Sequence, residues 1–237
     1  MKRSRIFLLI VLVASIALLA APFDLGKTGI LGLTVTLIII LTLTALLFEF
    51  ESSISSSKEI ALVAMLGTVS GVLRIPFAAI PGVQPCTYLI ICAGYVFGPV
   101  TGFMVGALTP LISNFFLGHG PWTPYQMFAW GAAGLSAALI RRLNLKRKEL
   151  IVLGFCWGYI YGIIMNLWFW ASFIYPLTFT TFIATLGRSI WFDTFHAVGN
   201  AVFMEILGMK TVRIFERFEK RFRVKIIKMP LKPQRYS

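Results

Sequence analysis

Eight apolar stretches, separated by short polar or charged segments, run through the sequence. They lie near residues 5–23, 29–48, 58–75, 86–99, 100–117, 124–141, 149–175 and 188–209. A helix needs about 20 apolar residues to cross a bilayer. The fourth stretch is shorter than that, so we expect it to tilt, to thin the bilayer locally or to cross only in part. The pattern predicts an all-α protein that crosses the membrane several times.

The composition points to lipid as the main solvent of the chain. Hydrophobic residues make up 58% of the sequence and charged residues 13%, and the mean hydropathy is +0.84. Soluble domains carry about 25% charged residues. The low charged fraction thus agrees with a membrane protein. From the positions of the apolar stretches we divide the 237 residues into two N-terminal transmembrane helices (1–57), a six-helix membrane core (58–209) and a basic tail (210–237).

The first apolar stretch has an alternative interpretation as a signal peptide. Lys2, Arg3 and Arg5 precede an apolar run, as they do in secretory signals. The run is longer than the apolar region of a usual signal peptide, however, and no clean A-x-A cleavage site follows it. Retention as a transmembrane helix is our prediction, and cleavage stays the alternative.

Basic residues are distributed unevenly between the two sides of the predicted bundle. If the stretches alternate in direction, all of the 22 Lys and Arg residues except Lys27, Arg74 and Arg188 fall on the side of the N-terminus. Cytoplasmic segments of membrane proteins carry such an excess. The sequence therefore predicts a multi-pass protein of the plasma membrane with both termini in the cytoplasm and the loops 75–85 and 117–124 outside.

The basic tail carries a second pattern. Its apolar residues recur at helical spacing, with Lys and Arg on the other face: Val212, Phe215, Phe218, Phe222 and Ile226. Such a helix is expected to lie on the anionic inner leaflet with its aromatic side chains in the interface. A solvated basic extension is the alternative. Membrane lipid is thus an expected partner, and nucleic acid is not.

Small residues recur at every fourth position in several stretches. They form two triplets: Gly98, Gly102 and Gly106, and Gly154, Gly158 and Gly162. Small residues let helix backbones approach closely in lipid, so both triplets predict tight packing within the chain. A looser set, Ala64 and Thr68 with Gly67 and Gly71, follows a predicted cytoplasmic loop. For the segment 61–71, contact of another membrane subunit with Ala61, Ala64 and Thr68 is a further interpretation.

The two outer loops carry candidate binding residues. Prolines stiffen both loops, and polar or aromatic side chains lie in them and just inside: Arg74, Gln84, Trp122, Tyr125, Gln126 and Trp130. Rigid aromatic and amide groups suit a pocket for a small organic solute. An aromatic belt at the membrane interface is the alternative for Trp122 and Tyr125.

Polar residues also fall inside the predicted spans. Asp193, His196 and Asn200 share one face of the last span, because their spacing is i, i+3 and i+7. Asn114 and Asn166 lie in two other spans. Such groups are costly in lipid and usually face a cavity, so we add all five to the candidate site. A hydrogen-bond network between helices is the alternative.

Motifs for catalysis and metal binding are absent from the sequence. It contains no HExxH, GxSxG or Walker A pattern, and no second His or Cys suits a metal site with His196. The three cysteines form no CxxC pattern and are expected to be small apolar residues. We predict no enzyme activity, no metal and no cofactor. The alternative is a membrane enzyme acting on a lipid or isoprenoid, with Asp193 and His196 as an acid–base pair.

Residues 73–138 carry a family resemblance. Its most specific parts are the turn GYVFGPVTGF and the stretch SNFFLGHGPWTPYQMFAWG. This run resembles the membrane-embedded substrate-binding subunit, or S component, of energy-coupling factor (ECF) transporters, and the likeness extends over about 58–208. The resemblance implies a six-helix core, here preceded by two extra helices, and a vitamin-type solute captured beneath the outer loops, near Arg74, Gln84, Trp122 and Gln126.

The resemblance also implies partners. Delivery of the solute would require a transmembrane coupling subunit and two ATPase subunits. The first core helix would dock on the coupling subunit through an Ala-xxx-Ala motif. This sequence departs from that motif, because Met65 stands four residues after Ala61 and Thr68 four after Ala64. Among S components the chain looks most like the branch linked to cobalamin, while other vitamins or a queuosine precursor are alternatives.

Overall fold

The computed structural model describes residues 30–53, 57–143 and 146–222, and no strand occurs in these ranges. The helices are α3 (Ile30–Ser53), α4 (Ser57–Phe77), α5 (Cys86–Phe97), α6 (Pro99–Leu117), α7 (Thr123–Ile140), α8 (Arg147–Phe173), α9 (Phe179–Phe203) and α10 (Met209–Phe222). A 3-10 turn (Arg141–Leu143) follows α7, and a π-helical segment (Met204–Gly208) joins α9 to α10. The all-α prediction is confirmed. The predicted span 5–23 lies outside the described residues.

The helices have the length and surface of membrane spans. Helices α4, α6 and α8, and the part Thr34–Glu51 of α3, are long and apolar enough to cross a bilayer. Large apolar side chains cover the outside of the bundle, and Phe115, Phe179 and Trp191 are each more than 70% exposed. A soluble protein rarely shows so much apolar surface. The prediction of a membrane protein is therefore confirmed.

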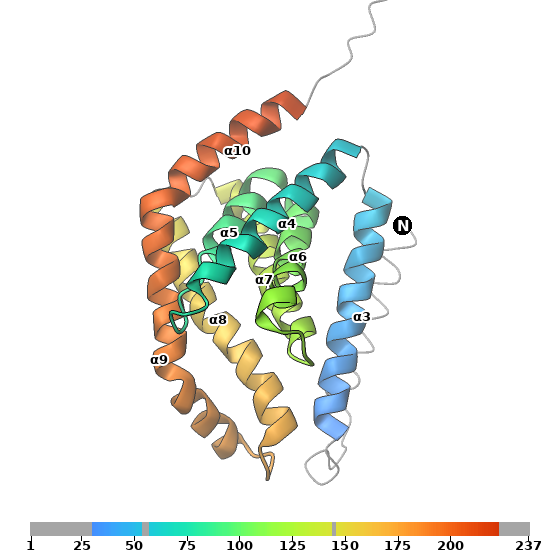
Figure 1. Ribbon diagram of the computed structural model, residues 1–237, viewed down its shortest axis with the longest axis vertical. Coiled ribbons are helices and arrows are strands. Elements are labelled where there is room, and N and C mark those ends of the chain that lie inside the picture. Colours follow the sequence, from blue (N-terminus) through green and yellow to red (C-terminus); the bar gives the residue numbers. More distant parts are fainter. Residues whose placement is uncertain (1–29, 54–56, 144–145, 223–237) are drawn as a thin grey trace, which may run out of the picture.

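The short helix α5 lies in the interior of the bundle, behind α4 in Figure 1. All of its residues from Cys86 to Val96 are buried, and it contacts every helix from α4 to α10. Lipid surrounds little of it, so its length need not match the bilayer. Two of the three cysteines, Cys86 and Cys92, are buried here, whereas Cys156 is exposed on α8.

The predicted start of the last span, residue 188, was wrong by more than two turns. Helix α9 already begins at Phe179, where Thr178 forms a capping box with Thr181. The side chain of Trp170 on α8 donates a further hydrogen bond of 2.9 Å to the Thr181 hydroxyl. The threonines of this first segment lower its hydropathy, so an apolar window misses a helix that capping and packing against α8 stabilise.

Glycines bring the backbones of α5, α6 and α7 into contact. A Cβ atom at Gly134 of α7 would overlap the backbone of Gly102 on α6, and one at Gly94 of α5 would overlap Gly134. A Cβ at Gly106 would overlap Trp130 and Gly131. The predicted tight packing is therefore confirmed for Gly102 and Gly106. It was wrong for Gly98, which has no atom near its Cβ position and instead turns the chain with φ +101°.

The second glycine triplet packs α8 against α9. A Cβ at Gly158 would overlap the backbone of Ala197, and one at Gly162 would overlap the Asp193 carboxyl group. Gly154 lies at ordinary contact distance from Asn200, with its Cβ position 3.5 Å from the carbonyl oxygen. Close packing is confirmed here as well, and at Gly162 it makes room for a polar side chain.

The amphipathic helix of the tail is confirmed as α10, but part of its apolar face meets protein. Val212 and Phe215 are buried, and the Phe215 ring lies 5.3 Å from that of Phe97 on α5. The prediction that the aromatic side chains lie in the lipid interface was therefore wrong for Phe215, because α5 offers a buried apolar surface. Phe218 is 44% exposed, and Ile226 lies outside the described residues.

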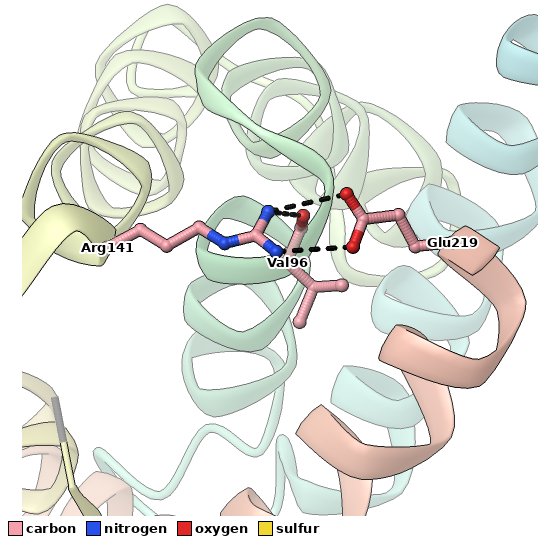
Figure 2. A network of polar contacts seen from close by, with 3 residues as sticks. All are labelled: Val96, Arg141 and Glu219. Atoms are coloured by element: carbon pink, nitrogen blue, oxygen red, sulfur yellow. Dashed lines mark hydrogen bonds and ion pairs between the residues drawn. The ribbon is translucent and has the colours of Figure 1, made fainter. Parts of the chain in front are cut away.

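A polar contact fastens α10 to the core (Figure 2). Arg141 donates hydrogen bonds to the carbonyl oxygen of Val96 and to the carboxylate of Glu219, at 3.2 Å between Nη2 and Oε2. Val96 lies in the last turn of α5, where carbonyl oxygens have no partner within the helix. The arginine thus satisfies the end of one helix and holds another beside it.

Candidate functional site

A cavity of about 290 Å³ lies between α4, α7, α8 and α9, beside the 78–85 loop. Its lining residues are Arg74, Gln84, Gln126, Tyr161, Gly162, Met165, Asn166, Trp168, Phe169, Ser189, Phe192 and Asp193. A second hollow of about 270 Å³ adjoins it between α8 and α9, with Arg188 and Thr185 on its wall, and shares Asn166, Phe169 and Ser189 with the first. Cavities that bind small ligands measure about 300–1,000 Å³, so the first cavity is near the lower end of that range.

The loop 78–85 forms one edge of the cavity. Consecutive turns shape it, through hydrogen bonds from Ala78 to Ile75, Ile80 to Phe77 and Val83 to Ile80. Gly82 has φ +75°, and its Cβ position is only 3.2 Å from the backbone nitrogen of His196. Only glycine fits this approach easily, and the approach seats the loop on α9 with Gln84 at the cavity.

Arg74 forms one wall. It stands in the last turn of α4, is 8% exposed, and donates hydrogen bonds to Gln84 Oε1 (3.2 Å), Ser113 Oγ (2.8 Å) and Asn114 Oδ1 (2.7 Å). Its guanidinium carbon lies 4.9 Å from the ring centre of Trp130. A cation over an aromatic ring is stabilised without losing its charge. The arrangement holds a permanent positive charge in a fixed position.

Asn114 is the centre of the support beneath Arg74. Its oxygen accepts from Arg74, and its nitrogen donates to Thr123 Oγ1 at 3.1 Å and to Gln126 Oε1 at 2.8 Å. The side chain is 2% exposed. Buried polar groups in lipid need such partners. The amide therefore connects three helices, α4, α6 and α7, at the wall of the cavity.

The opposite wall carries Asp193. Its Oδ2 accepts hydrogen bonds from Ser189 Oγ at 2.7 Å and Asn166 Nδ2 at 3.4 Å, and Asn166 also donates to Ser189 at 2.6 Å. Asp193 is 7% exposed. The carboxyl group occupies the space that the missing side chain of Gly162 leaves on α8. Polar groups from α8 and α9 thus line the same cavity as Arg74.

Aromatic and apolar side chains make up the rest of the cavity lining. Tyr161, Met165, Trp168 and Phe169 come from α8, and Phe192 comes from α9. The sequence interpretation missed them, although Tyr161, Met165 and Trp168 stand at i, i+4 and i+7. This helical face borders Asn166, which was identified, so the spacing was the available signal.

Five of the residues expected at the site line the cavity: Arg74, Gln84, Gln126, Asn166 and Asp193. Asn114 lies directly behind Arg74. Trp122 packs edge-on against Trp168, with ring centres 5.7 Å apart, and Tyr125 lies within hydrogen-bond distance of Thr36 on α3, at 2.8 Å. Both aromatic side chains therefore lie outside the lining.

Trp130 and His196 lie below the cavity in a layer with α5. Trp130 Nε1 donates to Thr87 Oγ1, and the same hydroxyl lies 3.0 Å from His196 Nε2. The Tyr161 ring contacts both side chains: it is tilted against Trp130, with ring centres 4.6 Å apart, and meets His196 edge-on at 4.9 Å. The expectation that both would line the pocket is not met, because α5 closes the bundle at this depth.

Asn200 lies deeper still. Its nitrogen donates to the carbonyl oxygen of Gly154 at 3.2 Å, and it is fully buried between α8 and α9. The spacing correctly placed Asp193, His196 and Asn200 on one face of α9, but of these three residues only Asp193 lines the cavity. Within the described residues, Asp193 and His196 share no hydrogen bond, and no three His, Cys, Asp or Glu side chains gather as a metal site would require.

Comparison with known protein families gives a match over more than half of the chain. Residues 58–208 match the family described as the substrate-specific component of ECF transporters. No curated protein and no solved structure matches the chain. The matched residues include helices α4 to α9 and every residue that lines the cavity. The chain therefore belongs to the family of substrate-specific components of ECF transporters.

Proposed function

We propose that this chain captures a vitamin-like organic solute from outside the cell in the cavity between Arg74 and Asp193. The observation that carries the proposal is a cavity lined by polar, charged and aromatic side chains, within the part of the chain that matches the family. Substrate-specific components are transporter subunits rather than enzymes, so the alternative of a lipid- or isoprenoid-converting enzyme is not kept. A cavity of about 290 Å³ favours a solute much smaller than cobalamin.

The direct test is capture of the solute. The detergent-purified chain is incubated with the small-molecule ultrafiltrate of yeast extract, washed and denatured, and the released molecules are identified by mass spectrometry. We expect one small organic molecule to be enriched in near-stoichiometric amount. A chain that remains folded and enriches nothing would contradict the proposed function.

Removing the side-chain amide group at two positions distinguishes an effect on solute binding from an effect on stability. Gln126 lines the cavity, whereas Asn200 is bonded to Gly154 outside it. We expect Gln126→Ala to weaken binding of the captured molecule by about 1–3 kcal/mol, roughly five- to a hundredfold. Asn200→Ala should lower the melting temperature and leave the affinity of the folded fraction unchanged. Titration calorimetry beside melting curves gives both values, and native affinity in Gln126→Ala would remove that residue from the site.

The partners we propose are a transmembrane coupling subunit and two ATPase subunits. The support is the outer face of α4, where Ala61, Ala64 and Thr68 are exposed while Gly67 and Gly71 of the same helix pack on α6. The Thr68 hydroxyl donates to the carbonyl oxygen of Ala64, so this face presents a smooth surface with no unsatisfied side-chain donor. Small residues allow another helix to approach it closely.

Enlarging this face should block assembly. We expect Ala64→Leu and Thr68→Leu to abolish co-purification with a co-expressed coupling subunit while capture of the solute persists. Val72→Leu, on the exposed surface one turn further along α4, is the matched control and should assemble normally. Unchanged co-purification in both variants would move the docking face to another helix.

We also propose that both termini are cytoplasmic in the plasma membrane, on the strength of the uneven Lys and Arg distribution. In a variant without native cysteines, Asn144→Cys and Gln234→Cys should resist a membrane-impermeant thiol reagent in intact cells. Both should react once the cells are opened. Labelling of the two positions in intact cells would reverse the orientation.

A further inference from the structure

We infer that the solute is bipolar: it carries an anionic group that binds Arg74, a cationic group that binds Asp193, and an apolar or aromatic middle. This inference rests on the proposed function, because it names the chemical class that the same cavity would take. Four observations carry it: within the described residues Arg74 has no partner charge, Asp193 has none, the two form no ion pair with each other, and the rest of the cavity lining is mostly apolar or aromatic.

Within the described residues, Arg74 has no counter-charge. Its Nε and Nη1 atoms donate to neutral oxygens of Gln84, Ser113 and Asn114, and no carboxylate of the described residues lies within ion-pair distance. In the same part of the chain no acceptor binds its Nη2 atom. Arginine cannot release its proton in proteins, and an isolated charge is costly in a membrane interior. A carboxylate or phosphate on the solute would complete this site with the fork geometry that guanidinium prefers.

Asp193, too, has no counter-charge among the residues that the structure describes. Its Oδ2 atom accepts from Ser189 and Asn166, both neutral, and no Lys, Arg or His of the described residues pairs with it. Gly162 leaves the room that the carboxyl group occupies at the cavity wall. A protonated amine or another protonated basic group on the solute would supply the missing charge.

The two charges line one cavity from different helices and do not pair with each other. Arg74 is the last basic residue of α4, and Asp193 stands in the middle of α9. If they formed an ion pair, the cavity would need no charged guest. Because no ion pair joins them, the cavity has a positive wall at Arg74 and a negative wall at Asp193, which favours a guest that carries the opposite charges.

The apolar part of the cavity lining indicates the chemistry of the uncharged part of the solute. Met165, Trp168, Phe169 and Phe192 offer apolar and aromatic surface there, and Tyr161 adds a ring. Such side chains bind flat or apolar groups and exclude water from the charges at either end. Exclusion of water strengthens both charge pairs, since Coulomb energies grow as the local dielectric constant falls.

The first test uses the molecule that the purified full chain enriches from the yeast-extract ultrafiltrate. We expect that molecule to be retained on cation exchange in acid and on anion exchange in base, as a compound with both an acidic and a basic group is. Retention on one column, or on neither, would overturn the inference and leave the proposed function intact. Enrichment of no molecule would overturn both.

The second test changes the two charges in the protein. Asn114→Asp places a carboxylate 2.7 Å from Arg74, at the oxygen that already accepts its hydrogen bond, and so neutralises the positive wall from within. Asp193→Asn removes the negative wall while keeping the shape of the side chain. Loss of one partner of a buried charge pair costs on the order of a hundredfold in affinity. We expect losses of that order in each variant, with melting curves confirming that both fold. Native affinity in both would overturn the inference.

A chemical control separates charge pairing from a change of shape. Methyl esterification of the captured molecule removes its negative charge. We expect the ester to bind the wild-type chain far more weakly than the parent molecule does, but to bind Asn114→Asp about as well as the parent does. An equal loss of affinity on esterification in both proteins would mean that Arg74 does not bind the negatively charged group, and the inference would fail.

Discussion

Gly134→Val is expected to abolish folding of the chain in the membrane. The added side chain would overlap the backbone of Gly102, and the Gly134 backbone already leaves no room for a side chain at Gly94. Overpacking a core costs about 1–3 kcal/mol where side chains can move aside. Here the obstacle is backbone, so α5, α6 and α7 would have to separate together. Fluorescence-detected size exclusion of a tagged variant should show little or no monodisperse protein.

A matched control tests whether valine itself is harmful in a helix. Gly187 lies on α9 with no atom within 4 Å of its Cβ position, so Gly187→Val should give nearly wild-type yield. Gly154→Ala, whose new methyl group would make an ordinary contact of 3.5 Å with Asn200, should also be tolerated. A wild-type elution profile for Gly134→Val would show that the three helices are not packed backbone to backbone.

Asn114→Leu is expected to cause the second-largest loss. It removes one of the two acceptors of Arg74 Nη1 and the donor to Thr123 and Gln126, all in the interior of the bundle. Each buried polar group that loses a hydrogen-bond partner costs about 1–3 kcal/mol, and each kilocalorie lowers the melting temperature of a chain of this size by about 2–4 °C. We expect a fall on the order of 10 °C in detergent, together with loss of solute binding.

The neighbouring residue supplies the control for this change. Phe115 is 78% exposed on the lipid side of the same helix, so Phe115→Leu should melt within about 2 °C of the wild type, as surface substitutions usually do. If Asn114→Leu melts as Phe115→Leu does, the network around Arg74 contributes little to stability. The amide would then serve only to position the guanidinium.

Hydrophobic pattern was sufficient for most of the fold, because lipid requires long apolar helices. The predicted spans 58–75, 100–117 and 149–175 differ from α4, α6 and α8 by two residues or fewer at each end. The pattern failed where other forces decide. The first turns of α9 are stabilised by the cap at Thr178 and by Trp170. The attachment of α10 depends on Phe97 and Arg141, which no pattern within 211–226 contains.

Part of the cavity lining could be predicted from polar residues inside the spans, because such residues are costly in lipid and usually face a cavity. Asn166 and Asp193 were identified on that ground, and both line the cavity. The same reasoning misplaced His196, because it cannot say how deep a cavity extends along a helix. That depth is set by α5, whose Thr87 engages both Trp130 and His196. The aromatic lining from α8 was missed because aromatic side chains are common in every membrane helix.

The positions of the cysteines provide a direct way to follow these experiments. Cys86 and Cys92 are enclosed in α5, while Cys156 faces outward from α8. The native chain therefore offers one thiol to a lipid-soluble dye, and two further thiols become reactive only when the bundle opens. A dye that fluoresces on reaction with thiols would report unfolding in detergent without any engineered label. The same probe would compare Gly134→Val and Asn114→Leu with their controls on one scale.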